Sequence, residues 1–372
     1  MNPYVPLIAG GASLGLSLAV SAFLTPVVRR WALQRDFVDR PLGAGSHKQH
    51  KQAVPFGGGI AITIAVLLPM ASVLVGGLIL HRLGPERLES WMPGLPVWGW
   101  AGGVLEKAPQ ALAIIAGALV MHLVGIVDDH RPLGPSFKLV VQLGTALLVA
   151  GGMGIRGLDV LGPVAATLLT AFWIVVLTNA FNFMDNMDGL SAGVATLTAT
   201  ILAVTAFRAG QLFVPCLLLL LAGAVAGFLI YNFPPASIFM GDAGSLVVGF
   251  LLAVFTVLTT FYDPDQQQRP FGVLVPLLVF AVPLYDMISV IVVRLRAGHS
   301  IWRSDRRHFS HRLVKLGLSP TSAVLTIFLA TLATALPATL LPLVNWTEAV
   351  LIFGQCVCVV AIIAILESRD AA

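Results

Sequence analysis

The sequence predicts an all-α, polytopic integral membrane protein with about eleven transmembrane helices, and three observations lead to this prediction. Of its 372 residues, 57% are hydrophobic and only 11% are charged. Globular domains carry roughly 25% charged residues, so a water-soluble protein of this size could not cover its surface. The mean hydropathy is +0.90, and the apolar residues fall into runs of about 20, the length that crosses a bilayer as a helix. We therefore expect a single membrane-embedded domain over residues 1–372.

Eleven apolar runs are long enough to be membrane spans. The first is too long for the core of a signal peptide and has no basic segment before it, so we expect it to remain as a helix. The ninth contains Pro276 and Pro283 and should be kinked, because proline removes a helical hydrogen bond. The runs are 5–28, 57–80, 109–127, 136–154, 158–180, 189–208, 212–231, 243–262, 271–294, 322–342 and 346–366.

The distribution of basic residues predicts the orientation. With the N-terminus outside and the C-terminus cytoplasmic, 16 of the 22 Lys and Arg residues face the cytoplasm, as the positive-inside rule requires. The net charge of +4 then reflects cytoplasmic loops, and we expect no nucleic-acid partner. In this arrangement 29–56 and 295–321 are cytoplasmic loops, and 81–108 is an outer linker.

The same orientation places the unexplained polar residues at the cytoplasmic ends of the spans. Asp128 and Asp129 follow the third span as an adjacent pair with no lysine nearby in sequence. Two neighbouring carboxylates repel each other at a membrane boundary and require a metal or a cationic partner. Further carboxylates and amides follow the fifth and seventh spans: Asn182, Asp185, Asp188, Asn232 and Asp242.

Each of these features also has a structural interpretation. Asp242 and Asp188 could cap the helices that follow them, and Asp286, within the ninth span, could be a buried residue bonded to a neighbouring helix. The two basic clusters could be ordinary positive-inside charges. They comprise Lys48, His50 and Lys51 in the first loop, and Arg306, Arg307, His308, His311 and Arg312 in the last.

Taken together, these residues favour a metal-dependent enzyme that handles phosphates at the cytoplasmic surface. Hard oxygen ligands beside Lys, Arg and His are what a magnesium–diphosphate site needs. Phosphoryl transfer depends mainly on such positioning and charge neutralisation. A secondary transporter would also have intramembrane carboxylates, but its sites usually lie near the bilayer midplane between two related halves. A non-catalytic scaffold subunit is a third interpretation.

Five stretches carry a more specific signal, in order and on one predicted face. They are His47–Lys51 followed by Pro55–Gly58, Val127–Asp129, Asn182–Leu190, Phe239–Ser245 and Asp305–Leu313. Over roughly residues 30 to 320 the chain resembles the polyprenyl-phosphate N-acetylhexosamine-1-phosphate transferases, in the branch that uses UDP-GlcNAc and undecaprenyl phosphate.

The resemblance implies an activity at the cytoplasmic face of the inner (plasma) membrane. Such enzymes transfer N-acetylhexosamine 1-phosphate, here with GlcNAc as the expected sugar, from a UDP-sugar to polyprenyl phosphate and release UMP. The reaction uses Mg²⁺ or Mn²⁺ and starts a cell-envelope glycan such as lipopolysaccharide or an exopolysaccharide. A homodimer is one assembly that the resemblance suggests.

It also implies roles for individual residues. Asp128 and Asp129 would deprotonate or orient the lipid phosphate, and Asp242 would bind the metal, with Asn182 as a second ligand. The other expected catalytic residues are Lys51, near the phosphates, and His308. The expected substrate-binding residues are Lys48, His50, Asp185, Asp188, Asn232, Phe239 as the ring that stacks on uracil, His311 and Arg312.

One departure from the family pattern, and the absence of a motif typical of another branch, bear on the choice of sugar. Many relatives that use UDP-GlcNAc have His-Ile-His-His where this chain has His308, Phe309, Ser310 and His311, so Ser310 replaces one histidine. The run of three histidines typical of UDP-MurNAc-pentapeptide phosphotransferases is absent from the sequence. That absence argues against the peptidoglycan alternative.

Overall fold

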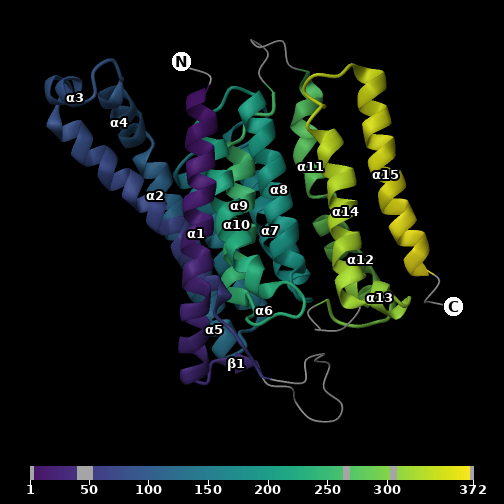
Figure 1. Ribbon diagram of the computed structural model, residues 1–372. Coiled ribbons are helices and arrows are strands. Elements are labelled where there is room, and N and C mark those ends of the chain that lie inside the picture. Colours follow the sequence, from purple (N-terminus) through teal and green to yellow (C-terminus); the bar gives the residue numbers. More distant parts are fainter. Residues whose placement is uncertain (1–3, 40–52, 263–268, 302–307, 369–372) are drawn as a thin grey trace.

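The computed structural model describes residues 4–39, 53–262, 269–301 and 308–368, and these residues form a helical bundle (Figure 1). A single pair of two-residue strands accompanies the helices in this described part, with β1 (Val38–Asp39) antiparallel to β2 (Val54–Pro55). The longer helices are α1 (Tyr4–Gln34), α2 (Gly58–Leu83), α5 (Ala108–His130), α6 (Pro135–Leu147), α7 (Pro163–Met184), α8 (Leu190–Arg208), α9 (Phe213–Asn232), α10 (Asp242–Leu258), α12 (Ala281–Arg296), α14 (Pro320–Ala338) and α15 (Trp346–Ser368).

The predicted all-α membrane fold is confirmed. Within the described residues, nine helical segments are long and apolar enough to cross a bilayer. A tenth candidate is the ninth predicted run, where the segment Pro270–Val279 meets α12 at an angle of 59°, so the predicted kink is confirmed. The remaining run corresponds to α10, which has 17 residues and is shorter than a usual span. Each of the eleven predicted runs thus contains a helix or a bent pair of helices.

The structure adds local detail that hydropathy did not indicate. The predicted outer linker 81–108 contains two short helices, α3 (Pro85–Trp91) and α4 (Val97–Glu106), which lie beside the end of α2 away from the main bundle (Figure 1). The rings of His81 and Trp98 stack at 4.9 Å and join α2 to α4. The fourth run continues past α6 as a short π-helix, Leu148–Gly152, before the next span begins.

Helix α10 is the centre of the bundle. Its residues from Ala243 to Thr256 are all buried, and it packs mainly on α5 and α7. A helix that is apolar on every side is expected in the interior rather than at the lipid surface. The first residue of this buried helix is Asp242, so the packing of α10 fixes the position of that carboxylate.

The end of the bundle where α10 begins is closed by a backbone contact between two of the five motif stretches. The backbone N–H groups of Gly58 and Gly59 donate to the carbonyls of Phe239 and Met240, each at 3.0 Å. The N–H of Phe239 in turn donates to the Pro55 carbonyl at 2.9 Å. The strand pair, the end of α5 and the start of α6 lie at this same end (Figure 1).

The orientation stays a prediction that cysteine labelling can test. In a variant without the native Cys216, Cys356 and Cys358, a cysteine in place of the exposed Glu89 should react with an impermeant thiol reagent on intact cells. A cysteine in place of the exposed Arg35, at the other end of the bundle, should react only after permeabilisation. Labelling of position 35 from outside would reverse the orientation.

Candidate active site

Three charged side chains from three helices meet at the closed end of the bundle. The ammonium nitrogen of Lys138, in α6, lies 3.0 Å from Oδ2 of Asp128 and 2.9 Å from Oδ2 of Asp242. The Lys138, Asp128 and Asp242 side chains are 20%, 15% and 24% exposed, so water screens them only in part. The Leu133 backbone N–H donates to Oδ1 of Asp128 at 2.6 Å. The aspartate pair was expected to need a metal or a cationic partner, and the turn after α5 brings Lys138, ten residues later in the sequence, into contact with Asp128 as a cationic partner.

Asp129 caps α10 from the neighbouring helix. Its Oδ1 accepts the backbone N–H of Asp242 at 2.8 Å, and its Oδ2 accepts that of Ala243 at 3.2 Å. Gly241 precedes α10 with φ +71°, and a Cβ there would lie 2.5 Å from Asp129 Oδ2, so the turn requires glycine. The alternative that Asp242 caps its own helix is therefore wrong. Its carboxylate is directed to Lys138.

Asn182 contacts the other oxygen of Asp242. Its amide nitrogen donates to Oδ1 of Asp242 at 2.9 Å and to the Ser245 hydroxyl at 3.0 Å. One turn earlier on α7, the amide of Asn179 donates to Gln142 Oε1 at 2.5 Å. Because Gln142 lies one turn after Lys138 on α6, these two amide contacts tie together the helices that carry the charged cluster.

The turn between α7 and α8 places two more carboxylates beside this cluster. Oδ2 of Asp188 accepts the backbone N–H of Ala236 at 2.9 Å, so Asp188 holds the loop before α10, and it makes no capping bond to α8. Burial and the negative charges of Asp242, Asp129 and Asp188 raise the pKa of the Asp185 carboxyl well above its usual range. A cationic or metal-bound ligand near Asp185 would lower this pKa again.

Phe239 and Asn232 differ in how much of them a ligand could reach. The Phe239 side chain is partly exposed, and its ring lies 6.2 Å from the ring of Phe56 in a tilted arrangement. Asn232 is only 3% exposed, its carbonyl oxygen accepts the Gly189 N–H at 3.0 Å, and its amide nitrogen donates to the Ile238 carbonyl at 2.9 Å. Asn232 therefore holds two loops together, a structural role that the sequence did not predict.

Asp286 anchors the last motif stretch. Its Oδ2 lies 3.1 Å from Nδ1 of His308, and its Oδ1 accepts the backbone N–H of Phe309 at 2.7 Å. Both side chains are buried, with Asp286 3% and His308 7% exposed. The interpretation of Asp286 as a buried polar residue bonded to a neighbouring segment is confirmed. That segment is α13 (Phe309–Lys315) with its preceding residue, the predicted sugar-phosphate loop.

The same loop is joined to the turn that carries Asp185. The Ser310 hydroxyl donates to Oδ1 of Asn186, and the Arg312 guanidinium donates to the Ser289 hydroxyl at 2.7 Å. His311 lies near His308, with 6.5 Å between the ring centroids. Ser310 thus links the two loops through a short side chain.

Five of the predicted basic residues lie outside the described residues: Lys48, His50 and Lys51 of the first predicted cytoplasmic loop, and Arg306 and Arg307 of the last. Of the other predicted residues, Asp128, Asp129, Asn182 and Asp242 form one contact network, and Asp185 adjoins it. His308, His311 and Arg312 form a second group, joined to the first through the Asn186 turn. Lys138 was missed as a site residue, although its position ten residues after Asp128 is compatible with a turn back to it.

The donor set of the cluster fits a hard divalent cation. Within the described residues no three His, Cys, Asp or Glu side chains converge on one point. Mg²⁺ needs no such cage, because one or two carboxylates with waters and substrate phosphates complete its shell. Asp128 and Asp242 each direct one carboxylate oxygen, Oδ2, to the point where the Lys138 ammonium lies, which we call the shared cation position. Asn182 would serve as a ligand only with its amide reversed so that the oxygen faces the ion.

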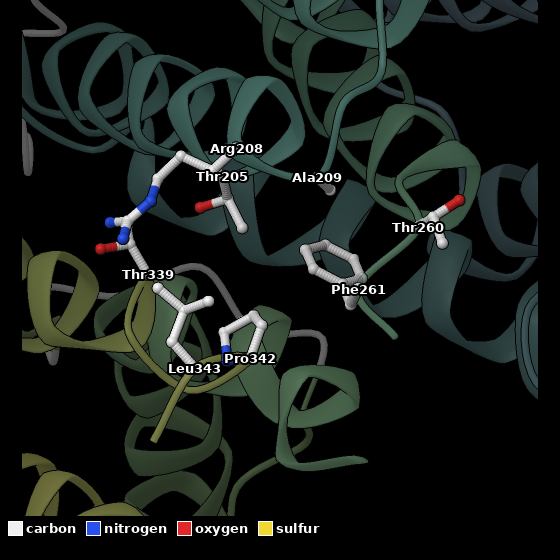
Figure 2. Close-up of a pocket in the computed structure, with 8 residues that line it drawn as sticks. All are labelled: Thr205, Arg208, Ala209, Thr260, Phe261, Thr339, Pro342 and Leu343. Atoms are coloured by element: carbon white, nitrogen blue, oxygen red, sulfur yellow. The ribbon is translucent and has the colours of Figure 1, made fainter. Parts of the chain in front are cut away.

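A cavity of about 220 Å³ lies at the opposite end of the bundle (Figure 2). Its residues lie in the last turn of α8 or just after the ends of α8, α10 and α14, and Arg208 is the charged residue among them. Helix C-termini carry partial negative charge, which stabilises the Arg208 guanidinium and disfavours an anionic ligand. This cavity therefore does not compete with the aspartate cluster as a phosphate site.

Several known proteins are similar to this chain in sequence. The family model for glycosyl transferase family 4 matches residues 111–260, which include Asp128 to Asp242. A probable undecaprenyl-phosphate N-acetylglucosaminyl 1-phosphate transferase of Bacillus subtilis is 31% identical, covering 84% of this chain and 80% of the relative. A decaprenyl-phosphate N-acetylglucosaminephosphotransferase of Mycolicibacterium smegmatis is 34% identical over 86% of this chain and 79% of its own. An undecaprenyl-phosphate alpha-N-acetylglucosaminyl 1-phosphate transferase of Yersinia pestis is 26% identical, covering 82% of this chain and 76% of the relative.

Proposed function

Because this chain belongs to the family of polyprenyl-phosphate N-acetylglucosamine-1-phosphate transferases, we propose that it transfers GlcNAc 1-phosphate from UDP-GlcNAc to a polyprenyl phosphate. The observation that carries the proposal is the cluster of Asp128, Lys138 and Asp242 at the start of the buried helix α10. Charges of both signs converge there at the end of a membrane bundle, where a lipid phosphate and a soluble nucleotide could meet. The names of the relatives support GlcNAc over MurNAc-pentapeptide.

The proposed site would hold Mg²⁺, with Mn²⁺ as a substitute, through Asp242 and Asp128. When bound, the ion would neutralise the diphosphate of the UDP-sugar. Lys138, already within 3.0 Å of both carboxylates, would pair with phosphate oxygens once its carboxylate partners bind the metal. Asp129 uses both oxygens to cap α10, so its contribution is to position Asp242.

The reaction forms one P–O bond and breaks another. An oxygen of the lipid phosphate attacks the phosphorus that carries the sugar, and the bond to the UMP phosphate breaks, so that UMP leaves. Asp128, whose Oδ2 faces the shared cation position, would orient or deprotonate the attacking phosphate. Asp185, Asp188 and Phe239 would line the nucleoside side of the site. His308, His311 and Arg312, held by Asp286 and Ser289, would meet the sugar phosphate.

We place this site at the cytoplasmic face of the inner membrane. The excess of basic residues at this end supports that location, and UDP-sugars are soluble substrates that must reach the site from the cytoplasm. The product, a GlcNAc-diphosphate-lipid, would start a cell-envelope glycan. The motif residues in the first loop, Lys48, His50 and Lys51, would add positive charge near the phosphates.

Isotope exchange tests the activity directly. Substrate and product each contain a diphosphate bond, so the reaction should lie near equilibrium, and purified protein should move label from free UMP into UDP-GlcNAc when lipid-linked product and Mg²⁺ are present. EDTA should stop the exchange because the diphosphate charge is then not neutralised. UDP-MurNAc-pentapeptide should give no exchange above background.

The competing interpretation gives the opposite pattern. A transporter would move UDP-sugar or ions into sealed vesicles without a lipid acceptor and would not exchange UMP. If no UDP-N-acetylhexosamine supports exchange while a known transferase is active in the same lipids, the proposed transferase activity is wrong.

A further inference from the structure

A buried histidine lies in the interior of the bundle, about two helical turns before Asp129 on α5. His122 of α5 is 9% exposed and sits seven residues before Asp129. Its Nδ1 lies 2.9 Å from the backbone carbonyl oxygen of Ala243 and 3.1 Å from the hydroxyl of Thr63 in α2. Ala243 is the second residue of α10, so His122 contacts the helical turn that carries Asp242.

Three residues on one face of α5 contact the first turn of α10. His122, Gly125 and Asp129 are spaced i, i+3 and i+7, which places them on the same side of a helix. A Cβ at Gly125 would lie 2.3 Å from the backbone nitrogen of Ala243, so glycine lets the two backbones approach. Asp129 accepts the N–H groups of this turn, and His122 contacts its carbonyl.

The contact determines which nitrogen of His122 carries the proton. A carbonyl oxygen can only accept a hydrogen bond, so Nδ1 must be the donor to Ala243. The Thr63 hydroxyl, at 3.1 Å, can accept from the same N–H or donate elsewhere. Two side chains of α5 thus hold the first turn of α10. Asp129 accepts its N–H groups, and His122 donates to the Ala243 carbonyl.

We propose that His122 is a positioning residue for the transfer reaction, which holds the first turn of α10 so that the Asp242 carboxylate is oriented toward the shared cation position. The proposal rests on the proposed function of the site and adds a residue outside the five motif stretches. A hydrogen bond to the Ala243 carbonyl restricts the rotation and tilt of the turn. A shift of about 1 Å in a ligand of this kind can reduce turnover about 10²-fold.

A purely structural role for His122 would have a different consequence. A polar residue that only satisfies a buried backbone group stabilises the fold, and its loss lowers the melting temperature without a specific effect on metal binding. A positioning role predicts that metal binding and turnover fall together, and that any side chain with a donor at the Nδ1 position restores them.

The test compares two substitutions at one position. His122→Asn places an amide N–H at about the position of Nδ1, whereas His122→Leu has similar bulk and no donor. We expect His122→Leu to lower kcat about 10- to 100-fold, with KM for UDP-GlcNAc unchanged within about twofold, while His122→Asn stays within about threefold of wild type. His81→Leu, in the α2–α4 contact at the other end, is the matched control and should keep full activity.

A second readout does not depend on turnover. A bound ligand raises the melting temperature by mass action, so the concentration of Mg²⁺ or Mn²⁺ that gives half of this increase reports metal affinity. For His122→Leu we expect that concentration to rise about tenfold, and for His122→Asn to stay near wild type.

The results separate the two proposals. If wild type shows no UMP exchange, the proposed function fails. If wild type is active and His122→Leu keeps its kcat and its metal affinity, or if His122→Leu and His122→Asn lose both equally, the positioning role is wrong while the transferase activity stands. A lower melting temperature without a change in metal response would also overturn it.

Discussion

Replacing Asp242 by asparagine should reduce turnover by about 10³-fold or more, equivalent to ~4 kcal/mol of transition-state stabilisation. Asn keeps the shape of the side chain but removes the negative charge that faces Lys138 and, in the proposed reaction, the metal. The melting temperature in the absence of metal should stay within a few degrees, because Asp129 still caps α10. Both quantities are measured on purified protein, turnover as UMP release from UDP-GlcNAc.

A matched control uses a carboxylate outside the site. Asp159 pairs with Arg156 at the other end of the bundle and is 62% exposed, so Asp159→Asn should leave turnover within about twofold of wild type. If Asp242→Asn keeps most of its activity, the carboxylate only complements the positive end of the α10 dipole and is not a metal ligand. If both variants lose activity, the loss reflects folding rather than the site.

Much of the architecture could be predicted because the bilayer imposes a strong constraint on composition. A spanning helix must be apolar over about 20 residues, so hydropathy alone located the segments that became the helices of the bundle. The bend in the ninth run could be predicted because proline has a defined effect on a helix. The short helices α3 and α4 were missed because a run of seven or ten residues beside an interface leaves no comparable signal.

The site was harder to predict, because its contacts join residues far apart in sequence. The sequence places Asp128 and Asp242 at helix ends but does not show that Lys138 lies between them. Nor does it show that Asp129 caps a helix that begins 113 positions later. Asn232 looks like a ligand-binding amide at a helix end, yet both ends of its amide are bonded to backbone. Only packing decides which polar groups are already satisfied.

Lys138 provides the second large effect that we expect. Lys138→Met removes the ammonium group but keeps a long apolar stem, which leaves Asp128 and Asp242 facing each other without a cation. Removing one partner of a largely buried ion pair lowers the free energy of unfolding by ~3 kcal/mol. Turnover should fall about 10²-fold or more, because the phosphate oxygens lose their cationic partner.

The effect of Lys138→Met on the melting temperature should depend on whether Mg²⁺ is present. In EDTA, Lys138→Met should melt at a lower temperature than wild type, since two carboxylates repel each other, and Mg²⁺ should raise its melting temperature by more than it raises that of wild type. Lys107→Met is the control, because Lys107 pairs with Glu106 at the exposed surface and should change neither quantity. If Mg²⁺ stabilises Lys138→Met no more than wild type, the metal and Lys138 do not share a position between Asp128 and Asp242. The metal would then have to be placed elsewhere in the site.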